Sequence, residues 1–364
     1  MKPNSSMKIL VIQQKMIGDV LISSLLCQHL KFLHPQSEIH YAIHSNTQGV
    51  VQLNPHIDRL IISTPDKNVQ QWIALIRALR KTQYDLVVDA YGKVESLIMC
   101  RFARAKAIYG HKKWFGPMIY TKTSVPSPKV YTQAGNAIED RLRLIYPEEQ
   151  IAENAMLYRP HIHMSQEETQ WAKKLLQTKG LNTGETLIMV SVLGSAEDKS
   201  LPKSTMAEIL SVLAQRPKTQ LLLNYLPSQK TEVNRILSLV PAALMQKIHP
   251  EVYGKSLRQF LALLSQVNCL IGNEGGAVNM AKALNIPTFT LFSPWIHKAA
   301  WNSYDDRETH VGLHLKDFKP ERFKDKTTLE IRQEFQAFYR DFKLDLFLNQ
   351  MIAFCDLHQV KPQD

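Results

Sequence analysis

The chain of 364 residues is long enough for two domains, each with its own hydrophobic core. Apolar residues make up 45% of it and charged residues 21%, as in ordinary globular proteins, which excludes a disordered or membrane-embedded chain. No window approaches about 18 uninterrupted apolar residues, and residues 1–7 are too polar for a secretory signal. We therefore expect a cytoplasmic protein without a transmembrane segment.

The net charge of +11 is unevenly distributed. Residues 1–160 carry 20 Lys and Arg against 12 Asp and Glu, and residues 161–364 carry 24 against 21. A basic N-terminal half is suited to an anionic partner, either at a membrane surface or on nucleic acid. No helix-turn-helix, zinc-finger or aromatic RNA-binding signature is present, so we expect no nucleic-acid partner. A solvated surface without a partner remains an alternative.

The four cysteines are scattered along the chain, three of them inside apolar runs, and no Cys-x-x-Cys pair occurs. This pattern predicts buried, reduced thiols, as is typical of a cytoplasmic protein.

Short apolar runs alternate with helical patterns in the first half of the chain. The predicted strands cover residues 8–13, 39–44, 59–63, 86–91 and 105–110, and the predicted helices residues 20–33, 70–81, 94–104 and 133–145. This alternation favours βαβ units and a mostly parallel sheet. Residues 147–160 are predicted to form a linker.

The second half repeats this architecture without repeating the sequence. Helices are predicted at residues 166–179, 204–214, 229–240, 256–266 and 277–284, and strands at 187–193, 220–225, 269–272 and 288–292. Residues 316–326 are predicted to be a charged loop, and residues 328–355 one or two helices. The sequence thus predicts an α/β protein with two Rossmann-like domains, residues 1–160 and 161–327.

A glycine-rich turn follows the predicted strand 269–272. It contains Glu274, Gly275 and Gly276, and a helical pattern begins directly after them. Glycines at a strand-to-helix turn allow close approach of a ligand to the backbone, and the helix N-terminus offers free N–H groups to an anion. The turn is therefore a candidate diphosphate site, the alternative being a tight turn without a ligand.

An acid stands at the corresponding place after the first predicted strand. Asp19 lies at or just before the start of the helix, at the C-terminal edge of the strand, where ligands bind in open α/β sheets. The alternative is that Asp19 only caps this helix.

Four segments in order, residues 17–21, 85–97, 190–202 and 270–287, are together similar to glycosyltransferase family 9, the heptosyltransferases of lipopolysaccharide core assembly. The chain departs from the family in the last of these. Glu274, Gly275, Gly276 and Asn279 stand where the family usually has Asp, Ser or Thr, Gly, and His. Leu25 replaces a common Pro, and Leu201 a common aromatic residue.

The resemblance implies a GT-B fold, with two Rossmann-like domains and a cleft between them. The N-terminal domain would bind the acceptor and the C-terminal domain the nucleotide sugar. By analogy of fold alone, helices in residues 328–364 would pack back on the N-terminal domain. Transfer would invert the anomeric centre, with Asp19 as the general base.

The resemblance also suggests roles for the donor residues. Ser195 and Lys199 would bind the diphosphate together with the backbone N–H groups of Gly275 and Gly276. Glu274 would accept hydrogen bonds from sugar or ribose hydroxyls, or hold a cation, and Asn279 would reach the same ligand. The expected donor is ADP-heptose. The altered motif keeps two alternatives open, a different nucleotide sugar and a catalytically idle scaffold; the presence of both the acid and the lysine argues against idleness.

The implied acceptor is an anionic glycolipid at the inner face of the cytoplasmic membrane. Gly18, Lys112 and Lys113 are the candidate acceptor residues, and the enzyme would be peripheral on that membrane. No tightly bound cofactor is expected; a divalent cation is compatible with the sequence but not required by it. No complete P-loop or dinucleotide-binding motif occurs, and His161 and His163 have no further ligands nearby for a metal site.

Overall fold

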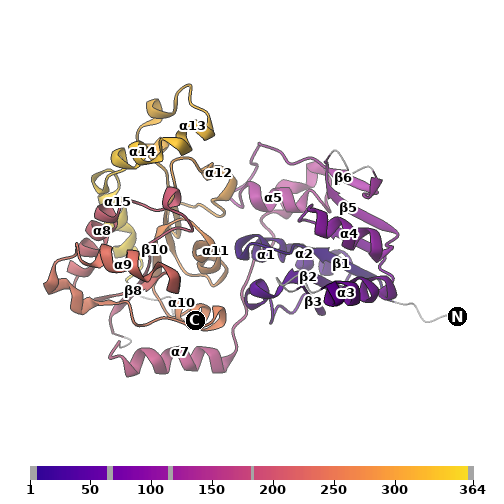
Figure 1. Ribbon diagram of the computed structural model, residues 1–364, viewed down its shortest axis with the longest axis horizontal. Coiled ribbons are helices and arrows are strands. Elements are labelled where there is room, and N and C mark those ends of the chain that lie inside the picture. The colour runs from indigo at the N-terminus through magenta and orange to yellow at the C-terminus, as the bar shows by residue number, and fades with distance from the viewer. Residues whose placement is uncertain (1–5, 64–68, 114–117, 182–183, 360–364) are drawn as a thin grey trace. The chain divides into compact units, whose positions relative to one another are not determined.

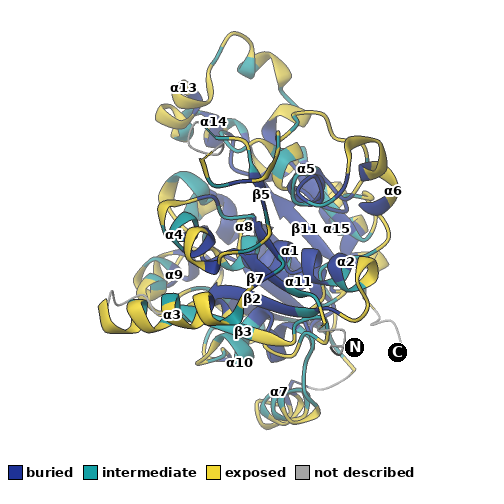
Figure 2. Cartoon of the chain, turned by 90° about the vertical axis from the view of Figure 1, so that its right-hand side faces the viewer, coloured by how far each residue is buried: buried dark blue, intermediate teal, exposed yellow. Residues whose placement is uncertain are grey.

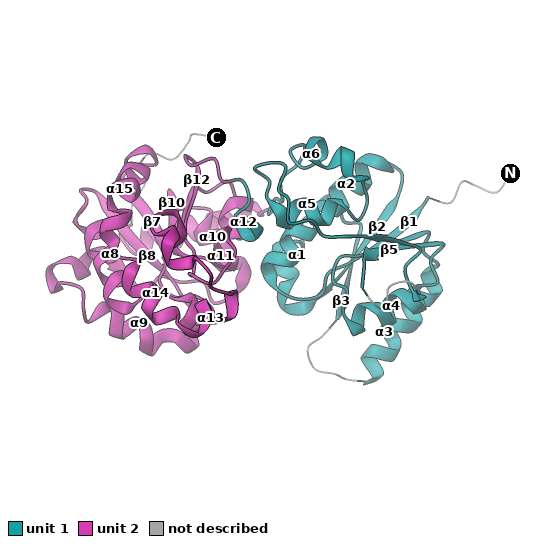
Figure 3. Ribbon diagram, turned by 90° about the horizontal axis from the view of Figure 1, so that it is seen from above, with its two compact units in different colours: residues 1–163, 299–304 teal, residues 164–298, 305–364 magenta. Residues whose placement is uncertain are grey.

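The computed structural model describes residues 6–63, 69–113, 118–181 and 184–359. The chain divides into two compact units (Figure 3). Unit 1 comprises residues 1–163 and 299–304, and unit 2 comprises residues 164–298 and 305–364. The boundary thus falls three residues after the expected one, and a short later segment returns to unit 1.

Unit 1 is an α/β domain with a parallel sheet of six described strands in the order β3-β2-β1-β4-β5-β6. The strands are β1 (Lys8–Ile12), β2 (Glu38–His44), β3 (Arg59–Ser63), β4 (Leu86–Asp89), β5 (Ala107–His111) and β6 (Lys122–Ser124). The helices are α1 (Ile17–Ser23), α2 (Leu25–Leu33), α3 (Val69–Thr82), α4 (Val94–Ala103), α5 (Asn136–Leu142) and α6 (Ile151–Asn154).

Unit 2 has the same topology, with the described strands in the order β12-β11-β10-β7-β8-β9. These are β7 (Thr186–Ser191), β8 (Thr219–Asn224), β9 (Ile248–His249), β10 (Cys269–Asn273), β11 (Thr288–Leu291) and β12 (His310–Leu313). The helices are α7 (Gln166–Thr178), α8 (Lys203–Gln215), α9 (Lys230–Leu237), α10 (Leu257–Leu264), α11 (Gly276–Ala283), α13 (Thr328–Gln333), α14 (Phe335–Asp341) and α15 (Leu348–Leu357) (Figure 1).

Each sheet reverses its direction of winding at one point. In unit 1 the chain runs outward from β1 to β3 and then from β4 to β6, so the switch lies between the paired strands β1 and β4. In unit 2 the switch lies between β7 and β10. Such switch points at the carboxyl ends of the strands are where open α/β sheets bind ligands. The two turns singled out in the sequence both follow strands at these points.

The first predicted helix is interrupted. The hydroxyl of Ser24 donates a hydrogen bond to the carbonyl of Leu21 at 2.7 Å, and α1 gives way to α2 at this residue. Local bonding of a serine hydroxyl to the backbone competes with regular helix, which explains the break.

The C-terminal helices α13, α14 and α15 belong to unit 2. Their buried residues belong to the core of unit 2, among them Phe338, Phe342 and Phe354. The ring of Phe354 lies 5.5 Å from that of Phe289 on β11. Burial of these large aromatic side chains anchors the helices to unit 2.

The segment that returns to unit 1 is residues 299–304, which includes most of α12 (Lys298–Trp301). Tyr304 is 4% exposed, its ring lies beneath the guanidinium of Arg159 at 4.5 Å, and its hydroxyl donates to the carbonyl of Tyr158. These contacts of the buried ring with Arg159 and Tyr158 explain why residues 299–304 belong to unit 1.

Residues 147–160 are not an open linker. They contain a 3-10 turn (Glu148–Gln150) and α6, and Ile151 is fully buried in unit 1.

No helix in the described part of the chain is long and apolar enough to cross a bilayer. Figure 2 shows dark blue, buried strands beneath more exposed helices such as α3, whose buried residue is Leu79.

Candidate functional site

The loop after β7 carries Ser195 and Lys199. It closes on itself through the backbone N–H of Gly194, which donates to the hydroxyl of Ser200 at 3.0 Å. A Cβ on Gly194 would lie only 2.2 Å from the carbonyl oxygen of Lys199, so the tight loop requires glycine. A 3-10 turn (Glu197–Lys199) ends at the lysine, and Ser195 is exposed.

The turn after β10 is equally constrained. Gly272 has φ +129°, and a Cβ there would lie 2.5 Å from the carbonyl oxygen of Ser191 on β7. Asn273 then joins the two turns: its side-chain oxygen accepts from the backbone N–H of Leu201 at 2.8 Å, and its amide donates to the carbonyl of Ser191. The glycine and the asparagine thus fix the two candidate donor loops against each other.

Gly275 gives the turn its shape. It precedes α11 with φ 154° and ψ −167°, a conformation that is essentially restricted to glycine. Gly276 is the first residue of the helix and has no positive φ. A Cβ on Gly275 would have no heavy atom within 4 Å, which leaves this backbone open to a ligand.

The lysine and the acid of the two loops meet. Lys199 Nζ lies 4.0 Å from Glu274 Oε1, and this oxygen accepts no hydrogen bond from the described residues. Burial raises the pKa of the Glu274 carboxyl above its ordinary value, and the ammonium of Lys199 offsets part of the rise. Asn279 lies half-buried one turn into α11, on the helix that follows this acid. The site therefore presents a cation and an acceptor oxygen with unused hydrogen-bonding capacity.

Three residues that the sequence did not suggest as partners surround this lysine. Trp295 lies under its ammonium at 5.2 Å, and the guanidinium of Arg332 lies over the same tryptophan at 4.6 Å. Arg332 also pairs with the carboxylate of Asp198 at 2.7 Å. Nothing in the sequence indicates that Arg332 reaches this loop.

Two tyrosines follow the neighbouring strands β8 and β9. The rings of Tyr225 and Tyr253 lie 6.5 Å apart, and Tyr253 is 47% exposed. The hydroxyl of Tyr225 donates to the carbonyl of Pro250 at 2.8 Å, which fixes its ring. Such a rigid, half-exposed aromatic pair at the carboxyl edge of the sheet is suited to stacking against a nucleobase.

In unit 1, Asp19 does not cap its helix. The N-cap of α1 is Met16, so Asp19 lies within the first turn, and its Oδ1 accepts a hydrogen bond from Arg141 Nη2 at 2.6 Å. Arg141 also donates to the hydroxyl of Ser23 and to the carbonyl of Ala137. Both ends of the Asp19–Arg141 pair are largely buried, at 20% and 15% side-chain exposure. The capping alternative is therefore wrong, and the acid is oriented by an arginine.

The candidate acceptor lysines are placed differently from each other. The ammonium of Lys113 donates to the carbonyl of Gly92 in the turn after β4, whereas Lys112 is exposed and its backbone N–H donates to the carbonyl of Ser124. His111 stands beside them, and its pKa is lowered to about 4 by burial and by the charges of Arg141, Lys113 and Arg143. Gly18 lies in the first turn of α1, beside Asp19.

Asp89 at the end of β4 is a structural acid. It is fully buried and accepts hydrogen bonds from the backbone of Tyr91 and Gly92 and from the hydroxyls of Ser96 and Tyr120. Burial raises the pKa of this carboxyl, and these donors offset part of the rise. It shapes the β4–α4 turn and leaves Asp19 as the more accessible acid at this edge.

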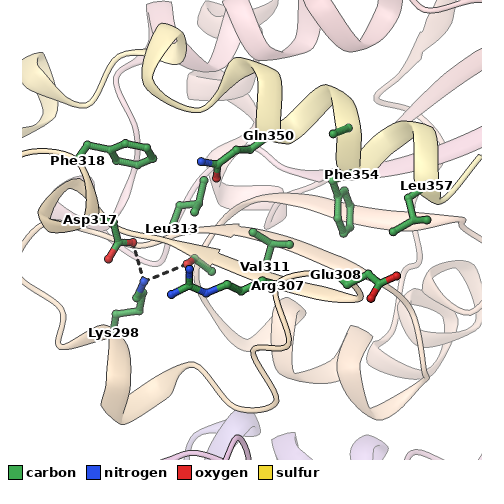
Figure 4. Close-up of a pocket in the computed structure, with 12 residues that line it drawn as sticks. Lys298, Arg307, Glu308, Val311, Leu313, Asp317, Phe318, Gln350, Phe354 and Leu357 are labelled. Atoms are coloured by element: carbon green, nitrogen blue, oxygen red, sulfur yellow. Dashed lines mark hydrogen bonds and ion pairs between the residues drawn. The ribbon is translucent and has the colours of Figure 1, made fainter.

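Unit 2 also has a hollow of about 600 Å³ at the edge strand β12 (Figure 4). Val311 and Leu313 of β12 and Phe354 and Leu357 of α15 line it. The ammonium of Lys298 in this hollow pairs with Asp317 at 2.6 Å and donates to the carbonyl of Gly312. None of the predicted donor residues lines it.

No group of three or more His, Cys, Asp or Glu that could hold a metal ion occurs within the described ranges.

Comparison with known proteins agrees with this architecture. The curated lipopolysaccharide heptosyltransferase 1 of Campylobacter coli is 24% identical over 297 residues, which cover 79% of this chain and 84% of that protein. A family 9 glycosyltransferase from Veillonella parvula superposes with a TM-score of 0.72 at 16% identity, over 96% of this chain and 97% of that one. The Escherichia coli heptosyltransferase WaaC with ADP superposes with a TM-score of 0.62 at 16% identity, over 91% and 100%.

The sequence profile of glycosyltransferase family 9 (heptosyltransferase) matches residues 72–330, more than half of the chain and including the β7 and β10 turns. The two Rossmann-like domains are those of a GT-B glycosyltransferase. The chain is therefore a glycosyltransferase and belongs to family 9.

Proposed function

We propose that the protein transfers heptose from ADP-heptose to a lipopolysaccharide-type acceptor, with inversion at the anomeric carbon. The observation that carries the proposal is the pairing of Lys199 with Glu274 at the switch point of unit 2, together with the Asp19–Arg141 pair at the switch point of unit 1. The curated relative from Campylobacter coli is a lipopolysaccharide heptosyltransferase, and the Escherichia coli structure contains ADP, which supports both the sugar and the nucleotide.

In this mechanism an acceptor hydroxyl attacks the anomeric carbon of the donor directly. Asp19 takes the proton of that hydroxyl, and the bond between the anomeric carbon and the diphosphate breaks, so that ADP leaves. Lys199 and the backbone N–H groups of Gly275 and Gly276 stabilise the charge that develops on the diphosphate, and Ser195 adds a hydrogen bond. One base and this electrostatic stabilisation suffice, so the proposal requires no tightly bound cofactor and no metal ion.

The remaining donor residues would recognise hydroxyl groups. Glu274 Oε1 is buried without a hydrogen-bond donor, and an unpaired buried acceptor is costly until a ligand hydroxyl donates to it. Asn279 lies one turn along α11 and would contact the same sugar or ribose. Tyr225 and Tyr253 would stack against the base.

The acceptor would be an anionic glycolipid at the cytoplasmic face of the inner membrane. The excess of basic residues in 1–160 supports this, as do Lys112 and Lys113 near the carboxyl edge of the unit 1 sheet. The enzyme would then be cytoplasmic and peripheral on that membrane.

A second candidate is the same reaction with another nucleotide sugar. It is favoured by the replacement of the usual family motif by Glu274, Gly275, Gly276 and Asn279. A thermal-shift panel with ADP, UDP and GDP separates the two, because a ligand at 100 times its dissociation constant adds about 2.7 kcal/mol of stability. Stabilisation by ADP alone supports the ADP-heptose proposal, and stabilisation by UDP or GDP alone contradicts it. If none of these three nucleotides stabilises the protein, the idle-scaffold alternative is favoured instead.

A further inference from the structure

The loop that carries Lys199 is tied to the C-terminal helices by a salt bridge and a stacked ring. Arg332 on α13 donates from Nε to Asp198 Oδ2 at 2.7 Å, and its guanidinium lies 4.6 Å over the ring of Trp295. Asp198 is the residue directly before the lysine. A single side chain from α13 therefore contacts two groups on which the lysine depends.

The main chain of this loop is held at the same residue. The carbonyl of Asp198 accepts hydrogen bonds from Ser293 Oγ at 2.6 Å and from Trp295 Nε1 at 2.9 Å. These two donors follow β11, whereas the loop follows β7. Asp198 is thus fixed through both its carboxylate and its carbonyl, so the backbone that leads into Lys199 has little freedom.

Trp295 also meets the lysine itself. Lys199 Nζ lies 5.2 Å over its ring, and the distance of 4.0 Å to Glu274 is at the limit of an ion pair. The ammonium of Lys203 in the same region is bound much closer, at 2.5 Å to Glu232. The π-face holds the ammonium in place by a moderate attraction without consuming its hydrogen bonds. Lys199 is consequently oriented but remains available to a ligand.

We propose that Arg332 is a positioning residue of the donor site: Arg332, Asp198 and Trp295 form a clamp that holds the loop of Lys199 in its binding geometry. The proposal rests on the proposed function in one respect, that Lys199 binds the diphosphate of the donor. It gives the C-terminal helices a role in the reaction beyond the stability of unit 2, and Arg332 itself does not touch the donor.

The alternative is that Arg332 only stabilises the helices. Arg322 provides a matched control, because it pairs with Asp341 at 2.8 Å and lies over the ring of Phe338 at 5.3 Å. It therefore has the same two kinds of contact in the same helical region, but neither contact is with the loop of Lys199. A role in stability alone predicts similar effects of Arg332→Gln and Arg322→Gln.

The experiment compares the full-length wild type with Arg332→Gln, Arg332→Lys, Trp295→Leu and Arg322→Gln. Hydrogen–deuterium exchange is measured on the peptide that covers residues 194–201, and affinity for ADP is measured by calorimetry. We expect Arg332→Gln and Trp295→Leu to speed exchange in this peptide and to weaken ADP binding. For Arg332→Gln the affinity should fall about tenfold, because the loop that positions Lys199 loses one ion pair and one cation–π contact. Arg332→Lys should restore part of the affinity, since lysine keeps the charge but not the flat guanidinium. Arg322→Gln should change neither quantity.

Wild-type exchange and wild-type ADP affinity in Arg332→Gln would overturn the proposal. Faster exchange with unchanged ADP affinity would also overturn it, because the loop would then move without consequence for Lys199. If the wild type itself does not bind ADP, the proposed function fails; the exchange rates then decide separately whether the clamp holds the loop.

Discussion

Asp19 and Arg141 lie 122 residues apart in the sequence, yet Asp19 Oδ1 and Arg141 Nη2 are 2.6 Å apart. The arginine is fixed in turn by Ser23 and by the carbonyl of Ala137. A carboxylate held in this way has a defined direction, which a general base needs. Because Asp19 forms an ion pair with Arg141, loss of its charge should lower the stability of the protein. A capping role would not have this effect, since Asn caps a helix as well as Asp.

The first prediction concerns Asp19→Asn. The amide oxygen still accepts from Arg141 but the charge is lost, so we expect unfolding free energy to fall by about 1 kcal/mol. Turnover should fall by about 10²–10⁴, because the acceptor proton has no base. Steady-state transfer and thermal unfolding measure the two effects.

Asp85→Asn is the matched control. Asp85 precedes β4, at the opposite edge of the unit 1 sheet, and pairs with Lys106 at 2.7 Å. It should show a similar loss of stability with normal turnover. If Asp19→Asn transfers sugar at the wild-type rate across pH, the base is another group.

The second prediction is that Lys199→Ala weakens ADP binding by about 1.5–3 kcal/mol, the usual worth of a charge-assisted hydrogen bond. Lys203→Ala is the control, because the ammonium of Lys203 is already paired with Glu232. Calorimetry on both folded variants decides the assignment. Equal ADP affinity in Lys199→Ala and the wild type would exclude Lys199 from the diphosphate site.

The third prediction separates the two glycines of the β10 turn. Gly275→Ala should destabilise the protein by about 1–3 kcal/mol, because its backbone conformation is essentially open only to glycine. Gly276→Ala should leave stability unchanged or slightly raised, since its Cβ would meet only Met280 at 4.0 Å and alanine favours a helix. Thermal unfolding of both variants tests this. A larger loss for Gly276→Ala would contradict the geometry of the turn.

Much of this arrangement could be predicted from the sequence. The strands β1, β2 and β3 and the turn from Glu274 to Gly276 follow from apolar runs and glycines, which are local signals. The strands β6, β9 and β12 were not predicted; β6 and β9 have 3 and 2 residues, too few for a periodic pattern, and the short run of β12 contains Gly312. Short strands at the margins of a sheet are specified by pairing with a neighbour, which the local sequence does not show.

The partners of the site residues could not be predicted for a related reason. Arg141 meets Asp19 across 122 residues and Arg332 meets Asp198 across 134. Both arginines lie on short helices, of seven and six residues, and nothing in the local sequence of either helix indicates a distant partner. The turns themselves were predictable because glycine has a local steric reason to be there, whereas an ion pair depends on where the fold places two distant elements.

The fourth prediction concerns the basic excess of residues 1–160. If this half meets an anionic membrane, the protein should sediment with anionic liposomes at low salt, and binding should fall steeply as salt is added. Neutral liposomes serve as the control. Absence of binding at low salt, or binding indifferent to salt, contradicts a peripheral location driven by charge.

The last prediction uses the pKa of Glu274, which burial raises above its ordinary value of 4.5 while Lys199 offsets part of the rise. An acid whose pKa is raised by folding holds its proton more tightly in the native than in the unfolded chain. Its contribution to stability is therefore fully present below about pH 4.5 and is lost as the pH rises through the higher native value. Glu274→Gln cannot ionise and should not lose this contribution.

We therefore expect Glu274→Gln to be more stable than the wild type near pH 8, and this advantage to shrink steadily towards pH 4. Chemical denaturation across that range measures the difference in unfolding free energy. Gln also keeps an oxygen that accepts a ligand hydroxyl, so ADP should still bind if that oxygen matters more than the charge. A stability difference that does not vary with pH would show that Glu274 ionises no less readily in the folded protein than in the unfolded chain. Lys199 would then fully offset the cost of burying the ionised carboxylate. Glu274 would not need a hydrogen bond from a ligand hydroxyl to be stable in its charged form.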